Sequence, residues 1–520
     1  MISNENLPTA PRTKVGLAGR RKIIRMKIKQ INDDLMKTNI HKWRHFMKSA
    51  GMGFFGQCRR RKTGVLLLIC LTLPAVSHAA PIMVAAAAKP GQEWKPMPTQ
   101  TLDTLAALGQ LPADSGLDVY GGLTSRKEKA TGFFHAAKVD GRWWLVDPEG
   151  CLFLNKSVNS VTTIPTPGAQ AAFEKTFGTP AKWAQGTTTT LRELGFNGVG
   201  AWSDTATLRA TEPPVAYARI WNFMSAYGEK RGGTYQQSGH IGYPKDCIFV
   251  FDPAFEKFCD EYAKKQLTAA KDDPWLFGHF SDNEMPLRRH VLTNYLALAE
   301  NDPGHQAAQK WLRERHGKDA TVKDVTEQDQ KDFLGVVAER YFRIVSTAIK
   351  KYDPNHLYIG CRFNGSVLKC PEVFKAAGKY VDVVSVNYYR VWTPVQDELA
   401  GWEHNAGKPI MITEWYAKGE DSGLPNTTGS GWLVKTQTER GQFYQNFTLA
   451  LMQSKVCVGW HWFKYIDNDP DDKTVDPSNT DSNKGLVNNR YVPYQPLQDA
   501  MKRLNERSYG IISYFDKNSK

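Results

Sequence analysis

Two glutamates at the ends of apolar runs carry the clearest chemistry in this sequence. The run 275–280 leads into Asn283 and Glu284, and the run 409–413 leads into Glu414. A continuous apolar run between turn residues is typical of a buried parallel strand, and parallel α/β enzymes place catalytic groups where such strands end. Two carboxyl groups are what glycosidic bond cleavage requires, one as proton donor and one as nucleophile or base. The alternative is that each glutamate pairs with a Lys or Arg at a strand end.

Alternating strand and helix patterns indicate how the two glutamates would be positioned. Strands are expected at 151–160, 196–202, 216–223, 275–282, 357–364, 381–388, 409–414 and 456–464, and helices at 182–193, 254–271, 331–351, 371–378 and 433–453. This alternation predicts an α/β fold, a (β/α)8 TIM barrel with a short N-terminal β-containing segment. Long insertions at 225–250 and 285–330 would then be active-site loops. The alternative, a doubly wound open sheet, lacks the Gly-rich loop that would follow one of its strands.

The positive charge of the chain is confined to its start. Residues 1–64 hold 16 Lys and Arg against 3 Asp and Glu, which accounts for +13 of the net +14. The remainder is nearly neutral, which argues against a nucleic-acid partner. A basic stretch, a short apolar run and small residues near 79 predict a signal peptide ending near Ala79 or Ala80, and translation starting at Met47 or Met52. The protein is therefore expected to be secreted or periplasmic, with no membrane span in the mature chain.

Four segments follow from these patterns. They are a basic leader and signal peptide (1–80), an N-terminal arm and short β segment (81–150), the catalytic barrel (151–505) and a C-terminal tail (506–520). Two short strands at 133–139 and 142–146 flank Asp140-Gly141, a hairpin signal. Residues 81–131 are expected to be an extended, irregular arm.

No metal or organic cofactor is predicted. Six cysteines follow the leader without a CxxC pair; Cys361 and Cys370 could form a disulfide, but nothing requires it. The segment from Asp467 begins like a calcium loop, but it lacks Gly at its sixth position and has Ser478 where Glu would bind calcium at the twelfth. Solvated loop acids are the favoured interpretation.

The placement of both glutamates resembles that of the retaining glycoside hydrolases of clan A. The resemblance implies that Glu284, preceded by Asn283 at the end of strand four, is the acid/base, and that Glu414, ending strand seven, is the nucleophile. Apolar neighbours and the charge of Glu414 should raise the pKa of Glu284. The resemblance also places a tyrosine beside the nucleophile, for which Tyr388 is preferred over Tyr389.

The same resemblance suggests which side chains contact the sugar. A tryptophan of strand eight, Trp460 or Trp462, is expected as the floor of the sugar site, and the other could belong to the core. Further candidates for binding sugar hydroxyls lie at strand ends: Trp202, Arg362, Asn364 and His461.

A narrower resemblance is to β-agarase-like enzymes of glycoside hydrolase family 50. It rests on the motifs at 141–150, 282–284, 412–414 and 459–463. It implies hydrolysis of β-linkages in a galactan-type polysaccharide or its oligosaccharides by double displacement. A β-galactosidase or β-glucanase of the same clan is the alternative within enzymes, and a non-catalytic carbohydrate-binding barrel is the alternative outside them. Sugar identity, endo or exo action and oligomeric state stay open.

Overall fold

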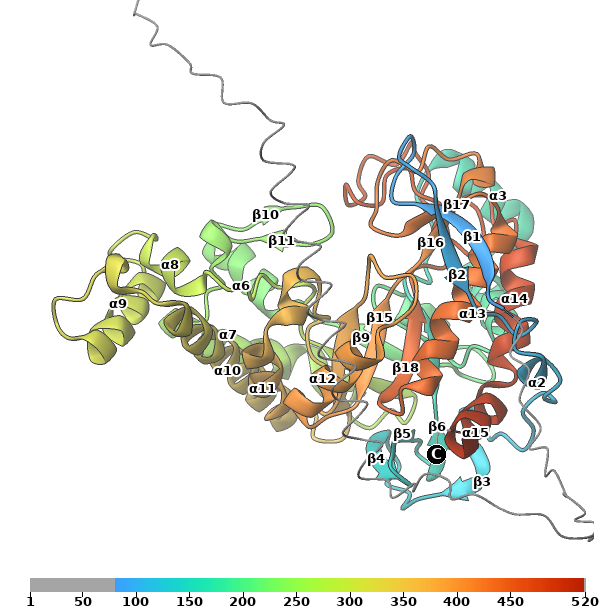
Figure 1. The fold of residues 1–520 in the computed structure, drawn as a ribbon, viewed down its shortest axis with the longest axis horizontal. Coiled ribbons are helices and arrows are strands. Elements are labelled where there is room, and N and C mark those ends of the chain that lie inside the picture. The colour runs from blue at the N-terminus through green and yellow to red at the C-terminus, as the bar shows by residue number, and fades with distance from the viewer. Residues whose placement is uncertain (1–79, 519–520) are drawn as a thin grey trace, which may run out of the picture. The chain divides into compact units, whose positions relative to one another are not determined.

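Eight parallel strands form the centre of the computed structural model, which describes residues 80–518 (Figure 1). Each strand expected in the central sheet is present, within shorter bounds. The strands are β7 (Asn155–Val158), β8 (Gly198–Val199), β9 (Ala216–Ile220), β12 (Leu276–Phe280), β13 (Leu357–Tyr358), β14 (Val384–Asn387), β15 (Ile410–Glu414) and β18 (Cys457–Trp462). Their side chains are almost all buried, as expected for a sheet covered on both faces.

The order of the strands is that of a curled, TIM-like sheet. The hydrogen-bonded order is β13-β12-β9-β8-β7-β18-β15-β14, so β18 pairs with β7 although they stand far apart in the chain. A continuous ladder does not join the end strands β13 and β14. They are linked instead by one parallel bridge between Phe363 and Val386 and by a bond from Asp382 N to Tyr358 O. The α/β class is thus confirmed, and the central sheet is an open, curled sheet of eight strands rather than the closed barrel that was predicted.

Helices connect the strands and cover the outer face of the sheet. All five predicted helices are present. Further helices of the barrel region that were not predicted include α12, α14, the short α5 and α3 (Pro167–Thr176), which lies between β7 and β8. The connecting helices are α4 (Pro180–Glu193), α5 (Thr205–Leu208), α7 (Pro253–Leu267), α10 (Glu327–Tyr352), α11 (Pro371–Gly378), α12 (Gln396–Ala406) and α13 (Gln437–Gln453), with α14 (Gln495–Asn505) after the last strand. Residues 506–520 include one more helix, α15 (Ser508–Asn518). Local sequence sets the helix starts: Thr326 and Asp329 form a capping box at α10.

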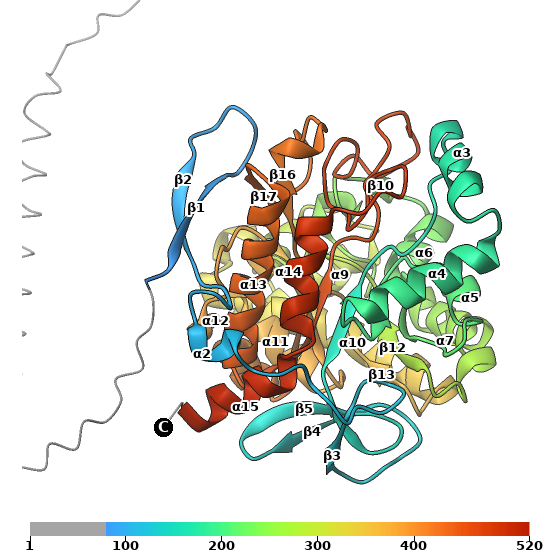
Figure 2. The same cartoon turned by 90° about the vertical axis from the view of Figure 1, so that its right-hand side faces the viewer.

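A four-stranded sheet lies at the amino-terminal end of the central strands (Figures 1 and 2). It consists of β3 (Leu123–Lys127), β4 (His135–Val139), β5 (Arg142–Val146) and β6 (Cys151–Phe153). The predicted hairpin is confirmed: β4 and β5 are antiparallel, and Asp140 and Gly141 both have positive φ. Phe134, Leu145 and Phe153 pack in one cluster with residues inside the central sheet, including Phe277. This sheet therefore closes the end of the structure away from the two glutamates.

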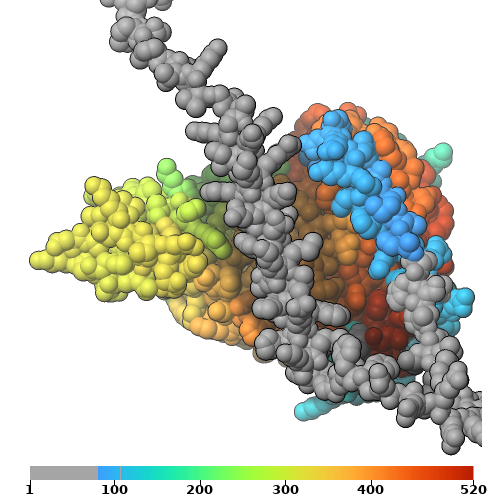
Figure 3. Space-filling model, viewed as in Figure 1, coloured from blue at the N-terminus to red at the C-terminus, as the bar shows by residue number. Residues whose placement is uncertain are grey.

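The arm expected to be irregular contains two strands. β1 (Ile82–Ala87) and β2 (Lys95–Thr99) form a hairpin, and β1 pairs with β17 (Trp432–Val434), which pairs with β16 (Ala417–Gly419). Figure 3 shows this hairpin in blue at the surface, beside orange segments. The prediction of an irregular arm is therefore wrong. Local patterns miss the pairing of β1 with β17 because these strands lie more than 300 residues apart, and β17 falls where a helix is expected.

Three further predictions concern the leader, membrane spans and the cysteines. The signal peptide lies almost wholly outside the described residues. No helix among residues 80–518 is long and apolar enough to cross a membrane. The six described cysteines, including Cys361 and Cys370, are free thiols and buried.

Candidate functional site

Glu284 and Glu414 meet above the carboxyl ends of the central strands. Asn387, the last residue of β14, donates from Nδ2 to Glu284 Oε1 at 2.7 Å and to Glu414 Oε2 at 2.5 Å. The sum of these two bonds, 5.2 Å, is the largest separation that the two oxygens can have. Thr413 orients the amide because its hydroxyl donates to Asn387 Oδ1 at 3.0 Å. One side chain therefore holds both carboxyl groups.

A fully buried arginine supports the pair from below. Arg362 donates from Nη2 to Glu414 Oε2 at 3.1 Å and from Nε to Asn283 Oδ1 at 2.9 Å. Its guanidinium lies over the rings of Trp202, 4.6 Å from the centroid, and Phe280. Arg362, predicted to bind sugar hydroxyls, does not line the pocket. Its contacts make it a positioning residue for Glu414 and Asn283.

The two carboxyl groups have different electrostatic surroundings. Burial and the adjacent Glu414 carboxylate raise the pKa of Glu284 to about 8, against the opposing effects of Asn387, Asn364 and Arg362. Glu414 instead accepts directly from the Arg362 cation. Glu284 thus carries a proton at neutral pH, whereas the Glu414 carboxyl group lies 3.1 Å from an arginine cation. This is the division of roles that an acid and a nucleophile require.

Backbone strain marks the strand ends around the site. Glu284 has φ +50°, Arg362 +57° and Trp202 +59°, all in the left-handed region that side chains rarely adopt. Ser160 and Arg390, which follow β7 and β14, do the same. Such conformations cost about 1–3 kcal/mol each and persist where surrounding contacts fix them, commonly at functional sites.

The tyrosine beside Glu414 is Tyr389 rather than Tyr388. Tyr388 is buried, and its hydroxyl donates to Glu398 of α12. Tyr389 lines the pocket, and burial and its hydrogen bond to Glu414 raise its pKa well above the ordinary value. The preference for Tyr388 is therefore wrong. Side chains alternate along a strand, so Tyr389 lies on the same face as Asn387, and this signal was available in the sequence.

Neither tryptophan of β18 forms the floor of the pocket. Trp460 donates from its indole nitrogen to the Tyr444 hydroxyl of α13, and Trp462 packs edge-to-face on Trp415. Both are fully buried on the helix-facing side, because residues two apart share a face of a strand. The expectation for Trp460 and Trp462 is wrong. Phe463, the next residue, lines the pocket instead.

His461 lies beneath the pocket and does not line it. Its Nε2 is 2.6 Å from Asn155 Oδ1, and its side chain is fully buried. Burial and the nearby Arg362 cation lower its pKa to about 3, so the ring is neutral. The expected direct contact of His461 with sugar hydroxyls is not supported.

A cavity of about 1410 Å³ opens above the two glutamates. Of the predicted residues, Glu284, Glu414, Asn283, Asn364 and Trp202 line it. The aromatic side chains that line it are Trp202, Trp221, Tyr235, Tyr243, Tyr262, Tyr389, Tyr416, Trp432 and Phe463. Such a lining, with a few convergent polar groups, suits a sugar, whose rings stack on aromatic faces.

The loop 225–250 lines this cavity, but the insertion 285–330 does not. The first contains most of α6 (Phe223–Arg231) and the β10–β11 pair (Tyr235–Gln236 and Ile241–Gly242). The second forms α8 (Val291–Leu296) and α9 (Pro303–His316) and contributes no lining residue. The prediction is confirmed for the first loop and wrong for the second, because α8 and α9 pack on each other and α8 packs on α10.

The loop after β18 and the β10–β11 segment, which both line the cavity, are hydrogen-bonded to each other. Asp476 accepts from Gly239 N at 3.0 Å and from Gln236 Nε2 at 2.7 Å. Gly239 O in turn accepts from Asn283 Nδ2 at 3.1 Å. The loop after β18 thereby connects with the residue that precedes Glu284.

Three of the four acids at 467–472 are buried in the structure, and only Asp471 is exposed. Asp467 accepts from Lys484 N, Gly485 N and Tyr494. Asp469 accepts from Thr166 and Arg490, and all three residues Asp467, Asp469 and Asp472 are buried. The interpretation as solvated loop acids is wrong for these three, since their carboxylates stabilise the loop by accepting bonds from the protein, and it holds for the exposed Asp471.

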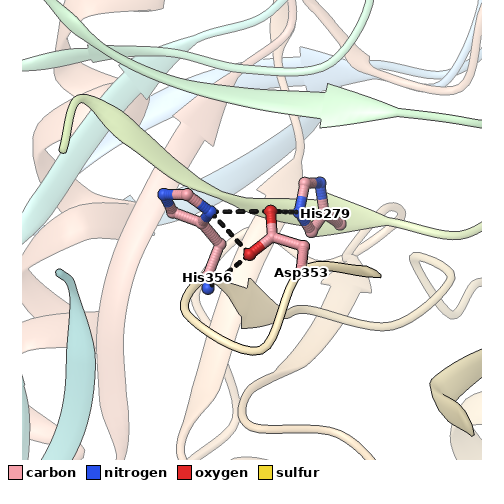
Figure 4. A group of neighbouring side chains, drawn as sticks. All are labelled: His279, Asp353 and His356. Carbon is pink, nitrogen blue, oxygen red and sulfur yellow. Dashed lines mark hydrogen bonds and ion pairs between the residues drawn. The ribbon is translucent and has the colours of Figure 1, made fainter. Parts of the chain in front are cut away.

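Two groups of side chains in the described part of the chain have the spacing of metal ligands. Figure 4 shows the first, in which Asp353 lies between His279 and His356 at 2.8 and 2.7 Å. Trp221 donates to His279 Nδ1, and His356 Nε2 bonds to the Asp273 carbonyl. Every imidazole nitrogen thus has a protein partner, so this cluster ties β12 to the segment after α10.

The second group consists of Asp118, Asp147 and Cys151. Asp118 accepts from Tyr120 N and Gly122 N, and Asp147 accepts from Glu149 N and Cys151 N. Burial and the neighbouring Asp118 raise the pKa of Asp147 to about 7, so Asp147 carries a proton below that pH. They hold turns of the N-terminal sheet together.

Comparison with known proteins agrees with this geometry. No family model matches the chain. The crystal structure of BpGH50 is 31% identical, with a TM-score of 0.74, over 86% of this chain and 98% of that one. The crystal structure of an agarase, AgWH50C, is 25% identical, with a TM-score of 0.64, over 79% and 68%. Beta-agarase B from Vibrio sp. (strain JT0107) is 26% identical over 81% of this chain and 53% of that protein.

The site and these likenesses define the class of the protein. Paired carboxyl groups in an aromatic-lined cavity, at the carboxyl ends of parallel strands, are the features of a glycoside hydrolase. The chain belongs to the agarase-like glycoside hydrolases that BpGH50 represents. It spans about half the length of the curated relatives it matches.

Proposed function

We propose that this protein hydrolyses β-glycosidic bonds of an agar-type galactan or its oligosaccharides, with retention of configuration. The observation that carries the proposal is the pair of bonds from Asn387, which keeps the carboxyl oxygens of Glu284 and Glu414 within 5.2 Å. Retaining glycosidases have carboxyl groups about 5–5.5 Å apart, whereas inverting enzymes need about 6.5–9.5 Å to admit a water. The substrate class is proposed from the named agarase relatives.

In the proposed mechanism each carboxyl group acts twice. Glu414 attacks the anomeric carbon while Glu284 gives its proton to the departing oxygen, leaving a covalent ester on Glu414. Glu284, now ionised, takes a proton from water as the water attacks the same carbon. The bond to Glu414 breaks, and both residues return to their starting forms. Tyr389 and Arg362 would position Glu414 throughout.

Two single variants test this assignment. Glu414→Gly and Glu284→Ala should each lose about 10²–10⁴-fold or more in activity on the polysaccharide. Glu229→Gln, at a glutamate of the same cavity outside the carboxyl pair, is the matched control. If both variants keep near-normal rates, the two glutamates are not the catalytic pair. Binding of the polysaccharide without any hydrolysis by the unaltered protein would instead indicate a carbohydrate-binding barrel. Activity on aryl β-galactosides or β-glucans but not on agarose would favour a β-galactosidase or β-glucanase instead.

A further inference from the structure

Four cations line the cavity on the side of Glu414 and the loop after β18. They are Lys89, Arg390, Lys464 and Lys484. Within residues 80–518 none of them forms an ion pair. The carboxylate of Asp476, which also lines the cavity, accepts hydrogen bonds from Gly239 N and Gln236 Nε2.

Lys484 is the most deeply buried of the four. Its ammonium lies 4.8 Å from the ring centroid of Tyr416 and 5.1 Å from that of Phe463. It donates to the Ser478 carbonyl at 2.9 Å and to Asn479 Oδ1, which leaves one of its three protons without a protein acceptor. Burial and the neighbouring Lys464 lower its pKa well below the ordinary value, while Glu414 acts in the opposite direction.

Lys464 has still more unused hydrogen-bonding capacity. Among the described residues its ammonium donates only to Asn468 Oδ1. Burial lowers its pKa to about 8 against the opposing effect of Asp467 and Asp472. A charge with so few partners in a low-dielectric site is costly unless something compensates it. A sugar hydroxyl is a neutral acceptor and compensates little, whereas a bound anion would form charge-assisted hydrogen bonds.

We propose that Lys464 and Lys484, with Lys89 and Arg390 at the rim, bind an anionic substituent on the sugar at or beside the cleavage point. The shared chemistry is that of a sulfate ester or a carboxylate. This inference rests on the proposed function and narrows its substrate class to an anionic galactan. Arg390 is exposed and lines the cavity, and its side chain has no hydrogen-bond or ion-pair partner within residues 80–518, so it can reach a substituent that enters the cavity.

The test compares three matched oligosaccharides: a neutral β-galactan fragment, the same fragment with a sulfate ester, and one with a carboxylate. The full chain should have a higher kcat/KM on one of the two anionic substrates than on the neutral one. The preferred substrate shows whether the site binds a sulfate ester or a carboxylate. Lys464→Gln and Arg390→Gln should each lose about 10–100-fold more on that substrate than on the neutral one, as expected for charge-assisted bonds. Lys473→Gln is the matched control, since Lys473 is exposed and outside the cavity.

Arg390→Gln separates a loss of anion binding from a loss of folding, because an exposed side chain contributes little to stability. Preference of the unaltered protein for the neutral fragment, or equal losses on all three substrates, would overturn the anion site. If either of these results is obtained while hydrolysis of the neutral fragment disappears in Glu414→Gly, the anion site fails and the proposed function stands. No hydrolysis of any fragment would overturn both.

Discussion

Glu284 and Glu414 accept hydrogen bonds from the same side-chain amide nitrogen, that of Asn387. This shared donor lies between two acids that would otherwise repel each other. It bonds to Glu284 from one side and to Glu414 from the other, while Thr413 and Asn283 fix its orientation. The spacing of the acids thus depends on a residue of the neighbouring strand.

Replacing Asn387 with alanine should lower kcat by about 10²-fold, the size of loss that follows removal of a positioned donor. Loss of the amide also removes a bond that lowers the pKa of Glu284, so this pKa should rise further. The pH profile of kcat/KM reports that change. Asn405→Ala, whose amide bonds only within α12, is the control. An unaltered pH profile in Asn387→Ala would contradict the role assigned to the amide.

The pH profile of the unaltered protein follows from the Glu284 pKa of about 8. The acid works only when protonated, so kcat/KM should be maintained below that pKa and fall as pH rises through about 8. Glu414→Gln removes a neighbouring negative charge, so the pKa of Glu284 should decrease in that variant. NMR titration of labelled glutamate measures it. An unchanged Glu284 pKa in Glu414→Gln would show that the acids do not interact.

Tyr389 and Tyr388 form a natural matched pair. Tyr389→Phe removes the hydroxyl facing Glu414 and should reduce kcat by about 10-fold or more, with less effect on KM. Tyr388→Phe removes a bond to Glu398 in the helix layer and should alter thermal stability more than kcat. Steady-state kinetics and thermal melting of both variants check this. The reverse pattern would restore Tyr388 as the residue that supports the nucleophile.

Sequence patterns predicted the positions of the strands and of both acids because local hydrophobic runs determine them. The alternation of side chains along a strand puts Tyr389 on the face of Asn387, and Trp460 and Trp462 on one common face, but the predictions at these positions followed the family resemblance. The family resemblance pointed elsewhere at these positions, and the strand geometry decides them. Asn387 and Lys484 could not be found this way, since their importance comes from contacts between distant segments.

Deleting residues 1–79 should leave a folded, active protein, because the first strand begins at Ile82. Thermal melting and activity on the polysaccharide measure the outcome. A longer deletion, of residues 1–99, is the comparison: it removes β1, which pairs with β17, and Lys89 of the cavity wall. That variant should lose stability and activity. Loss of folding in the shorter deletion would show that the leader belongs to the domain.

The configuration of the first product tests the central claim most directly. Proton NMR recorded during hydrolysis, before the free sugar equilibrates, distinguishes the two anomers of the new reducing end. Carboxyl oxygens within 5.2 Å of each other predict that the β-linked substrate first releases the β-anomer, with retention. In Glu414→Gly, added azide should restore turnover and give the α-glycosyl azide. Initial release of the α-anomer by the unaltered protein would contradict double displacement and the roles of both glutamates.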